Sequence, residues 1–328
     1  MSENLISVNN VSVNFDYQEN FISKKQKIHA VNNINIQIKK GSFFGLVGES
    51  GSGKTTLGRA ILGANKISSG NVIFHDDDRN YDLTNMNKQD LKEYRKKAQL
   101  IFQDPYAALS PRMTVRDIIA EPLEVMKITN SRQETDEKVR DIAAKCRLNI
   151  EHLRRFPHAF SGGQRQRISI ARALVSNPKF IVADESVAAL DVSIQADILN
   201  LLKQLQSELN LTYLFISHDL SVVAHVCDVV AVMYLGHIVE MGPSRELFKN
   251  PKHSYTKALL SSIPSIDPEK RSEAIELKGE IPSALNPPSG CAFRTRCPNP
   301  GVNCKGGDIK MGLTEIEPGH WVDECCVI

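Results

Sequence analysis

The sequence predicts an α/β fold, in which buried strands alternate with amphipathic helices. Three observations support this prediction. The apolar run at 43–47 leads into a glycine-rich turn, and the apolar run at 180–183 ends in two adjacent acids. A third apolar run at 214–216 is followed by Ser217 and His218. Short apolar runs that end abruptly in polar residues are typical of strands buried in a sheet, so these runs are expected to form its centre.

Two segments near the amino terminus predict a separate antiparallel β layer. Residues 8–15 and 30–38 alternate apolar and polar side chains, which is the two-residue period of half-buried strands. The most apolar stretch of the chain, residues 229–235, also has the length of a strand. Proline and glycine at 242–243, Pro251, Pro264 and Pro268 then indicate the end of the main domain.

The middle of the chain predicts a helical subdomain inserted into the α/β core, at about 104–170. Strand patterns are missing from 104–161, and residues 115–125 and 134–148 show helical spacing instead. Asp191 is expected to cap the next helix, whose apolar stripe is interpreted as core packing. The stripe consists of Ile194, Ile198, Leu201, Leu202, Leu205 and Leu209.

Length and composition fit one large domain with a smaller appendage. The chain has 328 residues, and its 40 basic and 38 acidic residues leave a net charge of only +2. This balance argues against a nucleic-acid partner, and the basic cluster of Lys24, Lys25 and Lys27 is interpreted as a solvated loop. Apolar runs stay well below the roughly 20 residues that span a bilayer, and residues 1–5 lack the features of a signal peptide. We therefore expect a cytosolic chain.

Residues 48–55 carry the first chemical signal, the pattern G-x-x-x-x-G-K-T. Its glycines let successive backbone N–H groups face phosphate oxygens, and a helix beginning near Lys54 turns its positive end toward the same anion. Lys54 is expected to reach the β- and γ-phosphates of a nucleoside triphosphate, and the Thr55 hydroxyl to bind Mg²⁺. A chance glycine-rich turn is the alternative, because the pattern specifies few positions.

Acidic, glutamine and histidine residues supply the further signals, in a defined order along the chain. Asp184 is expected to hold Mg²⁺ and Glu185 to orient water. Gln103 follows an earlier strand, the run Ser161-Gly162-Gly163-Gln164 precedes the acids, and His218 comes last. A lone histidine at a strand end is usually a satisfied surface or core residue, so the order of the motifs carries the argument.

This order resembles that of the ATP-binding cassette (ABC) family, from residue 1 to about residue 240. The resemblance implies a RecA-like P-loop ABC ATPase core with an antiparallel β layer and an inserted helical subdomain. It implies Glu185 as catalytic base, helped by His218 and Gln103, and Mg²⁺ bound by Thr55, Gln103 and Asp184. The residues implied to bind ATP are Phe15 (with Tyr17 as a rival), Gly48, Glu49, Ser50, Gly51, Ser52, Gly53, Lys54, Thr55, Thr56, Gln103, Ser161, Gly162, Gly163, Gln164, Asp191 and His218.

Three positions depart from the family pattern. Phe160, Ser186 and Ala188 stand where the family commonly has Leu, Pro and Ser. Phenylalanine keeps an apolar contact at the first position. Ala188 lacks the hydroxyl of the family's serine, in a segment that crosses the dimer in this family. The substitution therefore bears on how strongly the two ATP sites are coupled. The residues implied in hydrolysis itself are all present.

Four cysteines near the end of the chain form the second informative region: Cys291, Cys297, Cys304 and Cys325. In a cytosolic chain, clustered cysteines more often bind metal than form disulfides. Their spacing lacks the paired C-x-x-C of most structural zinc sites, which leaves zinc, an iron–sulfur cluster and metal-free packing thiols open. Cys326 adjoins the fourth of these, and Cys146 and Cys227 are expected to be core residues.

The same region carries a narrower resemblance. Residues 250–260, 279–283, 286–291 and 296–298 resemble the C-terminal extension of oligopeptide and dipeptide importer ATPases. Some members of that family carry a [4Fe–4S] cluster on these cysteines, so the resemblance favours a cluster, with zinc second. The domains expected are a nucleotide-binding domain at 1–240 and this extension at 241–328.

Residues 57–62, 104–109 and 111–115 resemble the F-type rather than the D-type subunit of these importers. The resemblance implies an ATPase that powers oligopeptide or dipeptide uptake from the cytoplasmic face of the membrane. Its implied partners are a D-type ATPase in a heterodimer, two transmembrane permeases and an external binding protein. A nickel or metallophore importer of the same family is the alternative. A soluble ABC ATPase acting on DNA or ribosomes is less favoured, because the chain has one cassette and lacks extended heptads.

Overall fold

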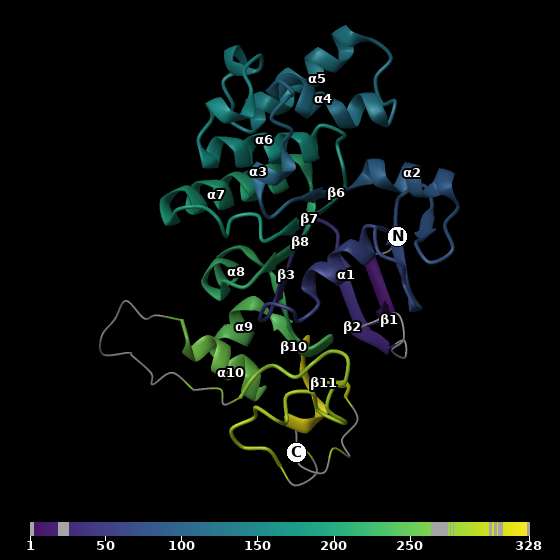
Figure 1. Ribbon diagram of the computed structural model, residues 1–328, viewed down its shortest axis with the longest axis vertical. Coiled ribbons are helices and arrows are strands. Elements are labelled where there is room, and N and C mark those ends of the chain that lie inside the picture. Colours follow the sequence, from purple (N-terminus) through teal and green to yellow (C-terminus); the bar gives the residue numbers. More distant parts are fainter. Residues whose placement is uncertain are drawn as a thin grey trace. The chain divides into compact units, whose positions relative to one another are not determined.

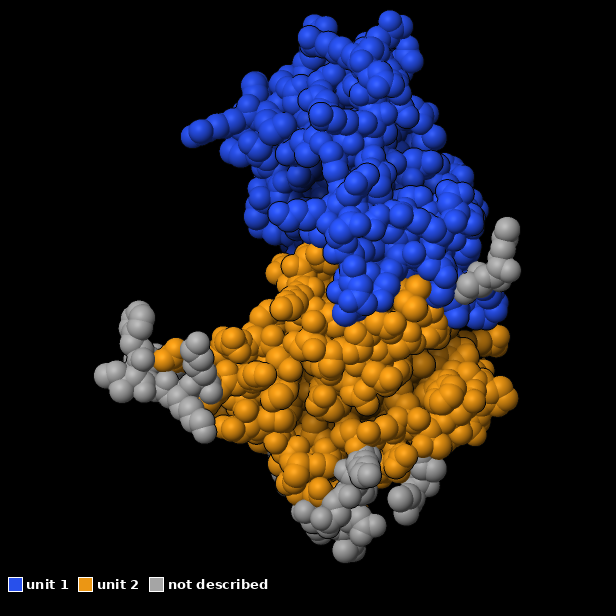
Figure 2. Space-filling model, turned by 90° about the vertical axis from the view of Figure 1, so that its right-hand side faces the viewer, with its two compact units in different colours: residues 1–6, 38–42, 74–216 blue, residues 7–37, 43–73, 217–328 orange. Residues whose placement is uncertain are grey.

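The structure is a computed structural model that describes residues 3–18, 26–263, 275, 277, 279–301, 304, 307 and 311–326 (Figure 1). The expected features at Lys24, Lys25, Pro264 and Pro268 lie outside these ranges. The chain forms two compact units (Figure 2). Unit 1 consists of Met1–Ile6, Ile38–Ser42 and Phe74–Ile216, and unit 2 of Ser7–Gln37, Phe43–Ile73 and Ser217–Ile328. The boundary expected at residue 240 stays a prediction.

A parallel sheet of three strands lies at the centre of unit 1. Its strands, in the order β8-β7-β6, are β8 (Thr212–Ser217), β7 (Phe180–Asp184) and β6 (Ala98–Ile101). Every residue of β7 and β8 is buried, which agrees with their continuous apolar runs. The strands expected at 180–183 and 214–216 are therefore confirmed. Unit 1 also contains β5 (Asn80–Asp82) and α2 (Lys88–Lys97).

Between β6 and β7 the chain is entirely helical or irregular, which confirms the inserted helical subdomain (Figure 1). Helix α4 packs against both α5 and α6. The N-cap hydroxyls of Thr114, Ser131 and Ser161 each accept a hydrogen bond from the first turn of the helix that follows, which explains where α4, α5 and α6 begin. The elements are α3 (Pro105–Ala108), α4 (Val115–Val125), α5 (Arg132–Lys145), η1 (Ile150–His152), η2 (Pro157–Ala159) and α6 (Gly162–Leu174).

Helix α7 (Val192–Leu209) confirms the expected apolar stripe but not its expected cap. Four stripe residues are buried, and the first and last, Ile194 and Leu209, are half-buried. Asp191 occupies the N-cap position without a side-chain hydrogen bond to the helix. The physical reason is exposure: Val192, in the first turn, is 82% exposed, so water can satisfy the free N–H groups there.

Unit 2 contains a mixed five-stranded sheet in the order β11-β12-β10-β9-β3. Strands β3 and β9 are parallel, and the remaining neighbours are antiparallel. The bounds are β3 (Phe43–Val47), β9 (Val229–Tyr234), β10 (His237–Pro243), β11 (Leu313–Glu317) and β12 (His320–Asp323). The hairpin of β11 and β12 was not predicted from the sequence. This hairpin adds two strands to the sheet that contains β3.

The expected β layer near the amino terminus corresponds to three strands in the order β2-β1-β4. They are longer than the periodic segments that predicted them: β1 is Asn4–Tyr17, β2 is Gln26–Lys39 and β4 is Ser69–His75. Helices with described bounds in unit 2 include α1 (Lys54–Ile61), α8 (Leu220–Val226), α9 (Ser244–Lys249), α10 (Ser254–Ser261) and η4 (Glu324–Cys326). Among the described residues, helices fall short of the length and apolarity that a bilayer span requires.

The buried carboxylate of Glu240 in β10 connects three parts of unit 2. Its side chain is fully buried and accepts hydrogen bonds from the backbone N–H groups of Lys252 (2.8 Å) and His253 (3.0 Å). It also lies 2.8 Å from Nε2 of His320 in β12. A buried carboxylate needs such partners, because burial without them is costly. Glu240 therefore connects β10 to the start of α10 and to β12.

We predict that Glu240→Gln lowers the free energy of unfolding of unit 2 by about 3 kcal/mol, the scale for removing one partner from a buried ionic group. Glutamine has nearly the same volume, but one of its two oxygens is replaced by a donor that would face another donor. Thermal unfolding and protease sensitivity of residues after 243 are the measurements. The matched control is Glu246→Gln on the exposed face of α9. Equal stability of the two variants would contradict the prediction.

Candidate functional site

The phosphate-binding loop connects β3 to α1 in unit 2, as the sequence predicted. Gly53, the N-cap of α1, has a φ of 103°, which side chains rarely tolerate. A Cβ atom at this position would lie 2.1 Å from the carbonyl oxygen of Ala30. Glycine is therefore required here both by backbone conformation and by space. This close approach allows the chain to turn from β3 into a helix whose N-terminus faces the loop.

Lys54 lies inside the loop that precedes it. The residue is 5% exposed, and its ammonium group donates to the carbonyl oxygens of Gly48 (2.7 Å) and Glu49 (2.9 Å). It also lies 3.4 Å from the hydroxyl of Ser52. The loop carbonyl oxygens thus hold a positive charge inside the loop, and an anionic ligand requires such a charge.

Glu49 is held by two residues from the C-terminal part of the chain. Its backbone N–H donates to the hydroxyl of Tyr255 in α10 at 2.9 Å. Its carboxylate accepts two hydrogen bonds from Arg296, at 2.7 and 3.1 Å. The hydrogen bonds with Glu49 raise the pKa of Arg296. Burial of the guanidinium lowers it, but by less, so the net shift is upward. Arg296, in the C-terminal part of the chain, therefore contacts the phosphate loop directly.

The two acids at the end of β7 have different environments in unit 1. Asp184 is 6% exposed and ends the buried strand. Glu185 has a left-handed backbone with a φ of 46°, a strained conformation that is often found at functional sites. Its carboxylate accepts a hydrogen bond of 2.6 Å from the side-chain amide of Gln103. The structure thus brings together the glutamine and the second acid, which lie 82 positions apart in the sequence.

Ser161 and Gln164 form a capping box at the start of α6. The Ser161 hydroxyl accepts from the Gln164 N–H at 3.4 Å, and the Gln164 side chain accepts from the Ser161 N–H at 3.0 Å. Gly163 allows a close approach, because a Cβ there would lie 2.5 Å from Cγ2 of Ile194 in α7. The run Ser161-Gly162-Gly163-Gln164 therefore presents an ordered helix N-terminus whose serine is exposed.

The remaining expected residues are positioned as follows. Phe15 and Tyr17 on β1 are 41% and 40% exposed, as an aromatic that stacks on a base must be before binding. His218 is exposed after β8, just before the Asp219 side chain caps α8. Unit 2 holds Phe15, the loop at 48–56 and His218, and unit 1 holds the other residues expected to bind ATP. Their roles stay predictions.

A second candidate site is a cavity of about 210 Å³ at the end of unit 2. It is lined by His253 from the start of α10 and by five cysteines. The cysteines are Cys291, Cys297, Cys304, Cys325 and Cys326. Those expected in the core, Cys146 and Cys227, are buried elsewhere, which confirms their interpretation. All four cysteines predicted to bind metal thus line one cavity.

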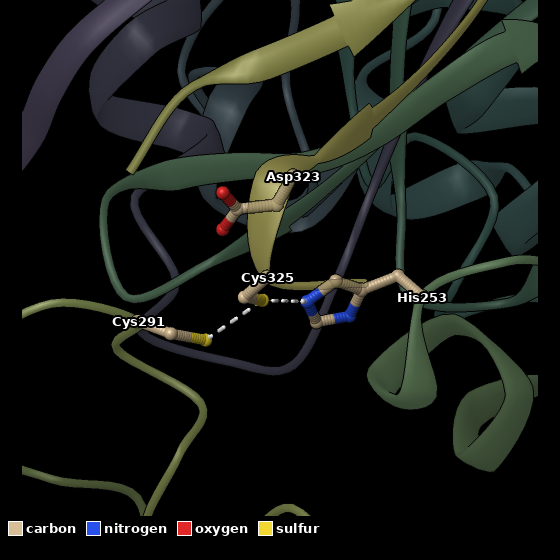
Figure 3. Close-up of side chains that lie close together, drawn as sticks. All are labelled: His253, Cys291, Asp323 and Cys325. Atoms are coloured by element: carbon tan, nitrogen blue, oxygen red, sulfur yellow. Dashed lines mark hydrogen bonds between the residues drawn. The ribbon is translucent and has the colours of Figure 1, made fainter. Parts of the chain in front are cut away.

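Within this cavity, Cys325 lies between two other donors (Figure 3). Its sulfur is 3.5 Å from the sulfur of Cys291 and 3.9 Å from Nε2 of His253. The donor atoms of these three residues and Asp323 all lie within 4.8 Å of one another. Nitrogen, sulfur and carboxylate oxygen donors at such spacing can hold a metal ion. His253 and Asp323 were not predicted from the sequence, because they lie outside the cysteine pattern and carry no local signal of their own.

Hydrogen bonds and burial shift the pKa values of several groups in the cavity, in both directions. Hydrogen bonding with Cys325 lowers the pKa of Cys291, and the same partner lowers the pKa of Cys326. Burial lowers the pKa of His253, but its hydrogen bonds to these sulfurs outweigh burial and raise it overall. Burial raises the pKa of Asp323 to about 7. Hydrogen bonding with Cys291 raises the pKa of Cys325, and burial raises that of Cys304. Cys291 and Cys326 are thus the cysteines favoured as thiolates, the form of cysteine that binds metals.

A third feature is an apolar groove in unit 1, with a volume of about 260 Å³. Two large apolar side chains at its lining are exposed, Phe102 by 41% and Val125 by 67%. Phe102 directly precedes Gln103, which donates to Glu185. A groove with exposed apolar side chains is a candidate protein interface. Its other lining residues are Gln99, Leu100, Glu121, Pro122, Met126, Ser169, Arg172 and Ala173.

Two family models match the chain. The model for the ABC transporter matches residues 31–188, and the model for the C-terminal region of oligopeptide/dipeptide transporters matches residues 239–304. The first match includes the phosphate loop, Gln103, the capping box and both acids. The second ends at Cys304 and includes Tyr255 and Arg296.

Relatives with similar sequences cover nearly the whole chain. A putative oligopeptide transport ATP-binding protein of Bacillus subtilis is 49% identical over 320 residues, which are 97% of this chain and 94% of that protein. An oligopeptide transport ATP-binding protein of Salmonella typhimurium is 48% identical over 92% of this chain and 90% of its own length. The similarity therefore extends through both the cassette and the tail.

Solved structures match the fold over the larger part of the chain. A dimeric ATP-binding cassette in a post-hydrolysis state, bound to ADP and phosphate, is 28% identical, with a TM-score of 0.63 over 73% of this chain and 99% of that chain. A cassette from an ABC transporter complex of Clostridium perfringens is 27% identical, with a TM-score of 0.64 over 76% of this chain and 92% of its own. These matches agree with the α/β core, β layer and helical insertion described above.

Proposed function

Because this chain belongs to the oligopeptide/dipeptide importer family of ABC transporter ATP-binding proteins, we propose that it hydrolyses ATP to power the uptake of oligopeptides or dipeptides. The observation that carries the proposal is near-full-length identity of 46–49% to oligopeptide transport ATP-binding proteins. The match of residues 239–304 to the oligopeptide/dipeptide transporter model supports a peptide cargo over nickel or a metallophore. It also speaks against a soluble ATPase acting on DNA or ribosomes.

The phosphate loop and the β7 acids support specific roles in ATP hydrolysis. We assign the phosphates to the loop backbone and Lys54, and Mg²⁺ to Thr55, Asp184 and Gln103. Glu185 is the group that would accept a proton from the attacking water, and the amide of Gln103 orients its carboxylate. Adenine is assigned to Phe15, with Tyr17 as the alternative.

The exposed start of α6 supports function in a pair of cassettes. Ser161 is exposed at the N-terminus of an ordered helix, where it can meet phosphate from a second chain. A related cassette has been solved as a dimer with ADP and phosphate bound. We propose a heterodimer with a D-type ATPase, in which His218 and Asp191 also contact the nucleotide.

The apolar groove beside Gln103 supports an attachment to membrane subunits. Its exposed Phe102 and Val125 offer the apolar contact that a short helix of a permease requires. We propose that two permeases and an external binding protein complete the importer, with this chain at the cytoplasmic face of the membrane. Movement of the groove would then reach Glu185 through Gln103.

The cysteine cavity supports a metal centre in the tail. Five sulfurs around one cavity exceed what a single ion needs, which favours a [4Fe–4S] cluster on Cys291, Cys297, Cys304 and Cys325. The closer group of His253, Cys291, Asp323 and Cys325 suits zinc, the second choice. Either centre would cross-link the tail and offset the entropy of ordering it.

The proposed catalytic role predicts that Glu185→Gln still binds ATP but hydrolyses it about a hundredfold more slowly or worse, since a general base is lost. Nucleotide affinity and turnover are measured on the same preparation. Glu208→Gln, on the surface of α7, is the matched control and is expected to keep wild-type turnover. Wild-type turnover in the Glu185 variant would remove this residue from the mechanism.

The proposed pairing predicts low ATPase activity in the isolated chain and a higher rate with the D-type ATPase and permeases. Ser161→Arg is expected to reduce that stimulated rate at least tenfold, because it places bulk and charge where a second nucleotide would bind. Ser207→Arg, exposed on α7, controls for the added charge. Full activity in a strictly monomeric preparation would contradict the pairing.

The two ligand sets of the tail predict different losses of metal. A cluster on four cysteines predicts that Cys304→Ser loses iron and sulfide while Asp323→Asn retains both. A zinc ion held by the closer group predicts instead that Asp323→Asn reduces zinc affinity at least tenfold, while Cys304→Ser retains zinc. Iron, sulfide and zinc are quantified after anaerobic purification. Stoichiometric absence of all metals from a wild-type tail that still resists protease would exclude both centres.

A further inference from the structure

Glu49, the second residue of the phosphate loop, is restrained on three sides. Its carbonyl oxygen accepts from Lys54, its N–H donates to Tyr255, and its carboxylate accepts twice from Arg296. Only the first of these partners belongs to the loop. The other two come from the C-terminal part of unit 2, and the Arg296 side chain is 8% exposed. A bidentate, largely buried arginine–carboxylate pair specifies geometry as well as adding attraction.

Arg296 is itself held rigidly. The N–H groups of Arg296 and Cys297 both donate to the carbonyl oxygen of Phe293, at 2.9 Å each, which closes a compact turn. The Phe293 ring is fully buried, and its centre lies 5.3 Å from the ring centres of both Tyr234 and Tyr255. The turn therefore packs against the same tyrosine that accepts from the loop. Aromatic packing of this kind fixes the direction in which the guanidinium points.

This turn is also a wall of the cysteine cavity. Cys291, Phe293 and Cys297 line the cavity, and the Arg294 N–H donates to the carbonyl oxygen of Cys291 at 3.1 Å. The segment that carries Arg296 thus has a cysteine at each end. A change in the cavity that shifts Cys291 or Cys297 therefore also shifts the backbone of Arg296, and with it the contact to Glu49.

We propose that Arg296 is a positioning residue for the phosphate loop, and that through it the occupancy of the cysteine cavity alters ATP affinity. The proposal rests on the proposed function, since the loop must bind ATP. A phosphate loop binds well when its N–H groups already face inward, because ordering a flexible loop on binding costs affinity. Arg296 and Tyr255 keep Glu49 in place before the nucleotide arrives. The tail is therefore part of the machinery for nucleotide binding.

The first experiment measures the dissociation constant of TNP-ATP for the full chain. Arg296→Met is expected to raise it about fivefold while the turnover number at saturating ATP changes less than twofold, because the loop must then be ordered at binding. Arg296→Lys is expected to recover only part of the lost TNP-ATP affinity, since lysine cannot form a bidentate pair with the Glu49 carboxylate. Arg245→Met, exposed on α9 and not part of the cavity lining, is the matched control and is expected to leave the dissociation constant unchanged.

A double-mutant cycle separates positioning from general weakening. If Arg296 acts through Glu49, Arg296→Met combined with Glu49→Gln raises the dissociation constant no more than the stronger single variant. Hydrogen exchange of the amides at 48–54 is expected to quicken in Arg296→Met, with β9 unchanged. A lower melting temperature with unchanged TNP-ATP affinity would overturn the proposal. Failure of the wild-type chain to bind TNP-ATP would instead overturn the proposed function.

The second experiment tests the connection to the cavity. Cys297→Ser is expected to raise the TNP-ATP dissociation constant about threefold in the wild-type background and to have no effect when Arg296 is already methionine. Metal content is quantified in every sample, so that loss of metal is measured apart from activity. An equal effect of Cys297→Ser in both backgrounds, or none in either, would overturn the role of the cavity while leaving the role of Arg296 to the first experiment.

Discussion

The buried carboxylate of Glu240 is the constraint on which the C-terminal half of unit 2 depends. It has no exposed surface, so its charge must be satisfied by the backbone N–H groups of Lys252 and His253 and by His320. That requirement positions the first turn of α10. From this turn, His253 reaches Cys325 in the cavity, and Tyr255 reaches the N–H of Glu49. One buried charge therefore sets the geometry of both candidate sites in unit 2.

The tail of this ATPase is consequently more than an appendage to the cassette. Its last hairpin extends the sheet that contains β3, and Arg296 closes on the loop that follows β3. The cysteine cavity lies beside the same first turn of α10. In an importer subunit, such an arrangement makes nucleotide affinity sensitive to how well the tail is folded, because the loop shares its supports with the tail.

Unit 1 shows how a strained residue is supported by ordinary structure. Glu185 adopts a left-handed backbone immediately after a fully buried strand, and its N–H donates to the carbonyl oxygen of Ile216 at 2.9 Å. The neighbouring strand thus stabilises the conformation that aims the carboxylate at Gln103. Phe102 in the groove directly precedes Gln103, and Gln103 donates a hydrogen bond to Glu185, so a partner at the groove would be only two residues away from the acid.

The sequence by itself determined the local elements and their chemistry. Strand β3, the loop and α1 were predictable because a glycine-rich turn between an apolar run and a helix has few other structures, and α4 was predictable from its spacing. Only the tertiary structure decided that Arg296 meets Glu49, 247 positions away, and that His253 and Asp323 join the cysteines. Such pairs depend on how β10, α10 and the tail pack together. Periodicity and motif spacing describe neighbours along the chain, so they contain no information on packing of this kind.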